Sequence, residues 1–191
     1  MATIAIAYAT RHGHTAKVAE YLAAALRREG LDVQLVDTAK PPRDPHLERV
    51  AGVIVAAPIH AGGYPRSTVQ WVRAHARELS RVPSAFCSIG LAVASRTADG
   101  RGKTQPIVDA FLRETGWRPD RTELVAGALA YSKYNVIVRF VMRRIAAANG
   151  GDIDTSRDYE YTDWEALRRF AAAIVGQVSP EARRPGPAPV T

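Results

Sequence analysis

The sequence predicts an α/β fold in which five parallel strands form one doubly wound sheet of order 2-1-3-4-5, with helices on both faces. Two observations predict it. Five short apolar segments alternate along the chain with segments of helical periodicity, as in successive β-α units. Polar loops follow the first, third and fourth of these segments, and in a parallel sheet such loops meet at one edge.

Length and composition predict a single domain. The chain has 191 residues, of which 47% are hydrophobic, which suffices for one large core. We expect this domain to span residues 1–178. Residues 179–191 are rich in proline and arginine and are expected to form a disordered tail.

The first strand and the loop after it carry the clearest functional signal. Ile4 and Ile6, with their alanine neighbours, form the apolar segment of a strand that is buried on both faces. The next loop supplies hydroxyls, a glycine and backbone amides at the start of a helix, in the residues Thr10, Arg11, His12, Gly13, His14 and Thr15. A helix N-terminus of this kind attracts a phosphate. The loop lacks the spacing of G-x-G-x-x-G and of the P-loop, so we expect a phosphate loop of another kind, with an ordinary tight turn as the alternative.

The middle of the chain continues the alternation of helix and strand. An apolar residue recurs at every fourth position from Val18 to Leu26, which predicts a helix. Residues 31–36 alternate between apolar and polar side chains and predict the second strand. Residues 50–57 are almost entirely apolar and predict a buried third strand, before a helix with apolar positions from Val69 to Leu79.

Two further loops at the same edge are candidate ligand contacts. After the third strand come a proline, a histidine and two glycines, in the residues Pro58, Ile59, His60, Ala61, Gly62 and Gly63. An ordinary turn is the alternative there. A histidine in such a loop is more often a plain loop residue than a catalytic one, and this applies to His60. The fourth strand, residues 84–91, ends in the candidate contacts Ser88, Ile89, Gly90 and Leu91. Arg96 lies on the rim of the long connection beyond them.

The last third of the chain closes the predicted fold. Residues 106–115 are expected to form a helix and residues 123–129 the fifth strand. A capping box at Thr162–Glu165 opens the final helix, which carries apolar residues at helical spacing up to Val178.

Residues 131–150 interrupt the pattern as an insertion with a basic, amphipathic helix. They contain four cations and no carboxylate. On a helical projection the apolar residues that share one face, which we expect to be buried, are Ile137, Val138, Val141, Met142 and Ile145. Val136 and Phe140 form a second apolar spot beside Arg143 and Arg144. Helices of this type favour membrane surfaces or anionic amphiphiles, and a crossover helix with a solvated basic face is the alternative.

Charge and cysteine content bound the class of protein. A formal net charge of +7 suggests an anionic partner. Nucleic acid is a poor candidate, because the basic residues are not interleaved with stacking aromatics. The single cysteine, Cys87, lies in an apolar strand and is expected to be a buried structural thiol. We expect no signal peptide and no membrane-spanning segment, and hence a cytoplasmic location.

The loop at residues 10–15 resembles the phosphate loop of flavodoxins, with Thr10, Gly13 and Thr15 in the matching places. This resemblance implies that the cofactor is flavin mononucleotide (FMN). It also implies that Ile59 to Gly63 lie near the isoalloxazine ring. No metal site is expected.

Several motifs further along the chain resemble a flavodoxin-fold family, the quinone-dependent protoporphyrinogen dehydrogenases. These motifs are residues 82–86 (VPSAF), 116–121 (GWRPDR), 126–129 (AGAL), Gly150-Gly151 with Asp154-Thr155, and 161–165 (YTDWE). The resemblance implies an enzyme of heme biosynthesis that oxidises protoporphyrinogen IX to protoporphyrin IX. It further implies FMN as cofactor, menaquinone or ubiquinone as acceptor, and peripheral contact with the inner face of the cell membrane.

In this interpretation the flavin performs hydride transfer, and no catalytic side chain is assigned. Substrate or membrane contacts are expected from Tyr64, Arg96, Tyr131, Lys133, Arg139, Phe140, Arg143 and Arg144. A homodimer is compatible with the resemblance, although no residue decides it. Two other classes remain open: an electron-transfer flavodoxin that serves a protein partner, and a flavodoxin-like binding module without catalysis.

Overall fold

The computed structural model describes residues 1–95, 100–148 and 150–178, and its centre is a five-stranded parallel sheet of order β2-β1-β3-β4-β5. The strands are β1 (Thr3–Tyr8), β2 (Asp32–Asp37), β3 (Gly52–Pro58), β4 (Ser84–Gly90) and β5 (Arg121–Ala126). The predicted fold class and strand order are confirmed. Central strands β3 and β4 are buried at every position, which explains why their sequences are apolar without alternation.

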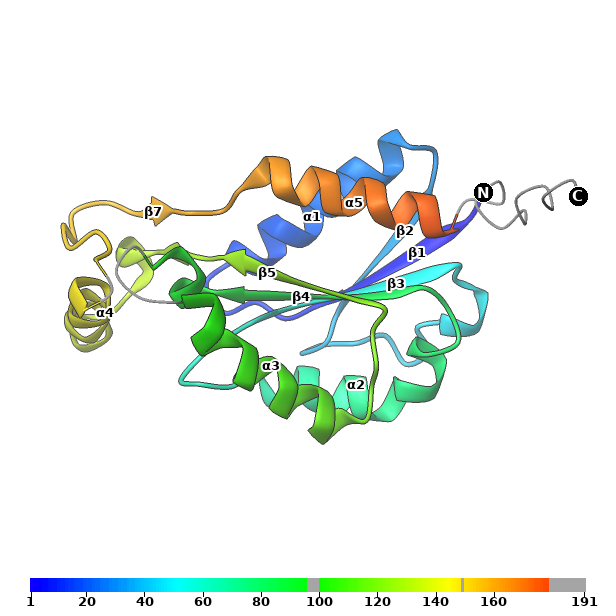
Figure 1. The fold of residues 1–191 in the computed structure, drawn as a ribbon, viewed down its shortest axis with the longest axis horizontal. Helices are drawn as coiled ribbons and strands as arrows, with labels where there is room; N and C mark the ends of the chain where they lie inside the picture. Colours follow the sequence, from blue (N-terminus) through cyan, green and yellow to red (C-terminus); the bar gives the residue numbers. More distant parts are fainter. Residues whose placement is uncertain (96–99, 149, 179–191) are drawn as a thin grey trace, which may run out of the picture.

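Two helical layers cover the sheet. The helices are α1 (His14–Arg28), α2 (Arg66–Leu79), α3 (Gly100–Thr115), α4 (Val136–Ala148) and α5 (Trp164–Val178). Figure 1 shows α1 and α5 on one face of the sheet and α2 and α3 on the other. Each layer has its own core, in which Ile4 and Ile6 pack toward α1 and α5 and Phe86 packs toward α2 and α3. Cys87 is fully buried and its thiol pKa is raised by burial.

Helix α4 stands apart from both layers. Figure 1 shows it at one end of the molecule, whereas the N-terminus and the end of α5 lie at the opposite end. A short antiparallel pair, β6 (Ala128–Leu129) and β7 (Tyr159–Glu160), brackets the insertion that carries it. A third small core of Leu129, Tyr131, Tyr134 and Ala146 anchors its base. Short 3-10 turns complete the chain as η1 (Leu47–Arg49), η2 (Leu91–Ala94) and η3 (Tyr131–Lys133).

The expected burial of the apolar face of α4 is wrong. Ile137 is 75% exposed, Val141 47% and Ile145 43%, and only Ala146 of this helix is classed as buried among the side chains described. Val138, which is 38% exposed, and Met142 lie toward the loops at the edge of the sheet, and Ile145 borders a small cavity with Leu91 and Leu129. Among the described residues, no helix is long and apolar enough to cross a membrane.

Candidate functional site

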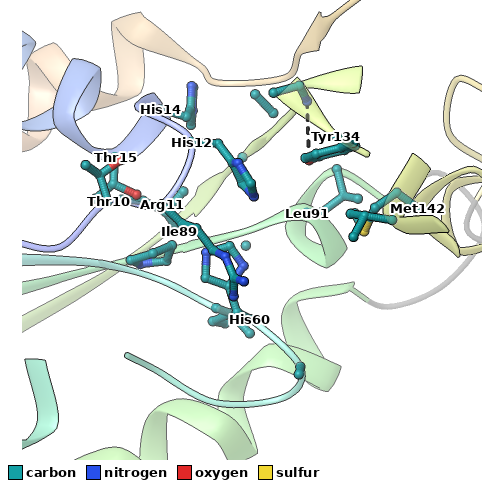
Figure 2. A pocket seen from close by; sticks show the side chains of 18 residues that line it. Thr10, Arg11, His12, His14, Thr15, His60, Ile89, Leu91, Tyr134 and Met142 are labelled. Carbon is teal, nitrogen blue, oxygen red and sulfur yellow. Dashed lines mark hydrogen bonds between the residues drawn. The ribbon is translucent and has the colours of Figure 1, made fainter. Parts of the chain in front are cut away.

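A pocket of about 300 Å³ opens at the carboxyl edge of the sheet. Three of its walls are the loops that follow β1, β3 and β4, which is where open parallel sheets place their ligands. The fourth wall comes from the residues after β5 and from α4. Figure 2 shows side chains from all these segments around one space.

The loop after β1 has a backbone geometry that suits an anion. Gly13 precedes α1 with φ of +91°, a left-handed conformation that favours glycine, and its N–H donates to Thr10 Oγ1 at 3.0 Å. The first backbone bond of α1 is from Lys17 N–H to the Gly13 carbonyl. Within the described residues, the N–H groups of positions 11, 12, 14, 15 and 16 have no acceptor. Free amides at the positive end of a helix dipole, beside the Thr10 hydroxyl, fit a phosphate.

The loop after β3 is held by a tight turn. His60 and Gly63 exchange two backbone hydrogen bonds, at 2.8 and 3.1 Å. The two residues between them, Ala61 and Gly62, both have positive φ, of 49° and 78°. Ile59 N–H also donates to the Ile89 carbonyl at 2.8 Å, which ties this loop to the end of β4. The turn therefore presents His60 and Ala61 to the pocket on a rigid support.

His60 carries an unsatisfied polar atom at the pocket. Its Nε2 is buried and has no hydrogen-bond partner among the described residues. Buried polar atoms are normally paired, so an unpaired one in a pocket wall fits a bound ligand with polar edges, such as a flavin ring. Burial, and then the charges of Arg11 and His12, lower the pKa of His60. The imidazole is therefore neutral at pH 7.

His12 lies between the loop after β1 and the insertion. Its ring approaches the His60 ring edge-on at 6.1 Å and the Tyr134 ring at 5.1 Å between centroids. Burial lowers its pKa, as do the nearby charges of Arg11 and Lys133. His12 and His60 are thus uncharged at neutral pH, and among the described residues Arg11 is the cation of the pocket lining.

The remaining wall is apolar. Tyr134, Val138 and Met142, spaced four residues apart, present one side of the insertion to the pocket, facing Ile89 and Leu91. Small residues after β5 complete the wall at Gly127, Ala128 and Ala130. A flat aromatic ligand fits between such a wall and the two loops.

The structure brings most of the predicted flavin contacts together. The residues that line the pocket as expected are Thr10, Arg11, His12, His14, Thr15, Pro58, Ile59, His60, Ala61, Ile89, Gly90 and Leu91. Gly13 lines a groove on the other side of the same loop. Ser88 is fully buried below the pocket.

Three predicted contacts lie elsewhere. Gly62, Gly63 and Tyr64 line a groove between α2 and α3 rather than the pocket. The Tyr64 ring packs against Phe86 and Phe111, and its hydroxyl shares a 2.7 Å hydrogen bond with Ser88 Oγ. These three residues therefore do not line the pocket, and their expected contact with the flavin or the substrate stays a prediction.

The predicted substrate contacts of the insertion also separate. Tyr131 is fully buried, and its hydroxyl donates to the Asp152 carbonyl at 2.9 Å, so its expected contact role is wrong. Arg139 is partly buried and donates to the Tyr134 carbonyl. Phe140, Arg143 and Arg144 are exposed, as expected for contacts with a partner. Arg96 and the expected tail, residues 179–191, lie outside the described residues.

Six pocket residues were not predicted. They are Gly127, Ala128, Ala130, Tyr134, Val138 and Met142. The spacing of four residues between Tyr134, Val138 and Met142 was visible in the sequence, but the apolar residues beside them obscured it. The small residues after β5 carried no signal.

The known proteins that resemble this chain in sequence or structure include flavodoxins. The sequence model of the flavodoxin domain family matches residues 5–156. Among solved structures, a short-chain flavodoxin associated with a bacterial microcompartment has a TM-score of 0.59 at 15% identity, covering 94% of this chain and 100% of its own. A flavodoxin of Streptococcus pneumonia TIGR4 has a TM-score of 0.57 at 18% identity, covering 93% and 100%. Fold and pocket together define a flavodoxin-type protein with FMN as its cofactor.

Curated relatives make the class narrower. The protein named protoporphyrinogen IX dehydrogenase [quinone] of Escherichia coli (strain K12) is 35% identical over 169 residues, which is 88% of this chain and 92% of the relative. Its namesake in Leishmania major is 32% identical over 166 residues, covering 86% and 71%. The chain belongs to the family of quinone-linked protoporphyrinogen IX dehydrogenases, and the resemblance seen in the sequence is confirmed.

Proposed function

We propose that this protein oxidises protoporphyrinogen IX to protoporphyrin IX, with FMN as cofactor and a quinone as electron acceptor. The observation that carries the proposal is the 35% identity, over 88% of the chain, to relatives named for this activity. The pocket supports it, because the expected phosphate loop, the unpaired Nε2 of His60 and the apolar wall all border the same space.

The residues of the site bind and orient. The free amides after Thr10 and the start of α1 hold the FMN phosphate, while the loops at His60 and Ile89 enclose the ring. Bound FMN supplies reversible acceptance of two electrons. A polar group of the bound ligand pairs with Nε2 of His60, which is unpaired at the pocket wall among the described residues. We assign no side chain as catalytic acid or base.

The substrate side of the pocket follows from its chemistry. A tetrapyrrole is a broad apolar ring system with two propionates. Its ring system packs against Leu91, Val138 and Met142. Its carboxylates pair with Arg11 at the pocket or with the exposed Arg143 and Arg144 of α4.

Anaerobic reduction of the bound flavin tests this function. When the holoprotein is mixed with protoporphyrinogen IX in the absence of oxygen, the flavin absorbance near 450 nm should fall. Roughly three flavins should be reduced for each porphyrin formed, since six electrons are removed in pairs. A menaquinone analogue should then restore the absorbance. A flavin that stays oxidised would instead favour an electron-transfer flavodoxin, and an apoprotein that takes up no FMN would favour a binding module.

We further propose that α4 rests on an anionic membrane surface, where a lipid-dissolved quinone is met. Val136 is 81% exposed, Ile137 75% and Phe140 58%, so the outer side of the helix is apolar. Exposed Arg143 and Arg144 flank this side, and residues 131–150 contain no carboxylate. Apolar side chains framed by arginines complement anionic lipid head groups, and the inner side of the same helix lines the pocket.

Vesicle sedimentation tests the membrane contact. The protein should sediment with vesicles that contain phosphatidylglycerol, and much less with phosphatidylcholine alone. The double variant Arg143→Gln/Arg144→Gln should lose most of the difference, while Arg27→Gln, on the distant C-terminal end of α1, should not. Equal sedimentation of the wild type with both lipids would contradict the proposal. A protein that dimerises through Ile137 and Phe140 and ignores vesicles would show instead that a second copy covers α4.

A further inference from the structure

The start of the insertion contacts the phosphate loop directly. Lys133 Nζ donates a hydrogen bond to the His12 carbonyl at 2.7 Å. The next residue, Tyr134, places its ring against the His12 imidazole, with centroids 5.1 Å apart and planes at 73°. Two consecutive residues of the insertion therefore hold one residue of the loop, by its backbone and by its ring.

The contact fixes one peptide group of the loop at both ends. The peptide between His12 and Gly13 accepts from Lys133 through its carbonyl, and its N–H donates to Thr10 Oγ1. Lys133 lines the neighbouring groove and not the pocket, so the carbonyl is turned out of the anion site. A peptide group has a dipole of about 3.5 D, and a carbonyl turned toward a phosphate would repel it. Lys133 holds the loop in the arrangement that an anion needs.

The position of Lys133 is itself fixed by its neighbours. The backbone N–H and the hydroxyl of Ser132 both donate to the Asp158 carboxylate, at 2.8 and 2.7 Å. These bonds, together with the charge of Lys133, lower the pKa of Asp158. Buried Tyr131 anchors the other side of the same turn. The exposed lysine side chain is thus presented to the loop by a rigid base.

The same segment continues into α4. Tyr134 lines the pocket together with Val138 and Met142, one and two helical turns further on. We propose that Lys133 is a positioning residue of the FMN phosphate loop and that Lys133 and Tyr134 couple occupancy of this loop to the seating of α4. Coupling of this kind is reciprocal, so FMN steadies α4 and a seated α4 tightens FMN binding. The inference deepens the proposed function and rests on its FMN site.

Comparison of FMN with riboflavin tests the positioning role, because riboflavin lacks the phosphate. Flavin fluorescence is titrated with apoprotein of the wild type and of Lys133→Gln. The variant should bind FMN about tenfold more weakly and riboflavin as before, while Lys133→Arg should restore most of the FMN affinity. Arg77→Gln, which removes an exposed cation from α2, is the control for net charge. Unchanged FMN affinity, or an equal loss for both flavins, would overturn the role of Lys133.

Hydrogen exchange tests the coupling separately. In the wild type, FMN should slow exchange of the backbone amides of residues 138–147, and riboflavin should slow it less. The double variant Lys133→Gln/Tyr134→Leu, saturated with FMN, should lose most of this protection. Full protection in that variant would overturn the coupling. A wild-type apoprotein that binds neither flavin would overturn the FMN assignment first, and this inference with it.

Discussion

Replacing Gly13 by alanine probes the phosphate loop at its most constrained position. Gly13 has φ of +91° between the Thr10 bond and the first turn of α1. An added Cβ would lie 3.3 Å from Lys133 Nζ, so the lysine would have to shift by only a few tenths of an ångström, which its 2.7 Å bond to the His12 carbonyl can absorb. The main penalty is therefore the left-handed backbone, about 1–2 kcal/mol for a residue with a Cβ.

The penalty is expected in FMN affinity rather than in stability. Without a phosphate, the alanine of the Gly13→Ala variant can relax toward negative φ. This change rotates the peptide group between residues 12 and 13 and breaks the hydrogen bond from its N–H to Thr10 Oγ1. Binding of FMN must then restore the left-handed loop, so affinity falls by about 5- to 30-fold, the equivalent of 1–2 kcal/mol. Riboflavin affinity should change little.

Gly30→Ala is the matched control. Gly30, just beyond α1, also has positive φ, of 79°, and an added Cβ there would meet nothing within 4 Å. It lies outside the pocket, so its strain has no ligand to relieve it. We expect Gly30→Ala to lower the free energy of unfolding in urea by about 1–2 kcal/mol and to leave FMN affinity unchanged. The added methyl group also restricts the unfolded chain, which offsets about 0.4–1 kcal/mol of this loss and does not affect FMN affinity.

Fluorescence titration of the two apoproteins decides the matter. If Gly13→Ala binds FMN as tightly as the wild type, the left-handed turn is not part of the phosphate site. If both variants lose FMN affinity equally, the effect is a general loss of stability.

Other parts of the structure give further predictions. Tyr64→Phe should lower the free energy of unfolding by about 1–3 kcal/mol, because it leaves the buried Ser88 hydroxyl without its partner, and FMN affinity should not change. His60 and His12 have pKa values below the ordinary 6.5, so the unfolded chain binds more protons in mild acid and stability falls as the pH drops from about 7 to 5. His60→Gln should reduce this fall in urea midpoints, and an unchanged pH profile would contradict the assigned environment. Cys87 should react with a thiol reagent only at the rate of unfolding, since it is fully buried, and rapid labelling of native protein would show otherwise.

The fold, and the position of the loop at residues 10–15 beside the pocket, were predictable because their signals are local. A strand buried on both faces must be apolar throughout, and β3 shows this directly in its sequence. The loop at residues 10–15 combines hydroxyls, a glycine and a following helix, each of which has one physical use there. These features do not depend on what the rest of the chain packs against.

The insertion was less predictable because its sequence is ambiguous. Between Val136 and Met142 every residue except Arg139 is apolar, so helical periodicity does not select the side that faces the protein. The tertiary anchor made by Tyr131 and Ala146 selects it instead. Tyr64 lines the groove between α2 and α3 and not the pocket for a related reason, because the sequence of a loop does not tell what its last residue packs against.

The arrangement of the chain ends has a practical consequence. β1 enters, and α5 finishes, at the end of the molecule opposite α4, as Figure 1 shows. A fluorescent label at the start of β1 would therefore lie far from α4. A tether attached there would leave the end of the molecule that carries α4 accessible. Immobilised on an electrode in this orientation, the protein would present its cofactor chamber outward to whatever reactant is supplied in solution.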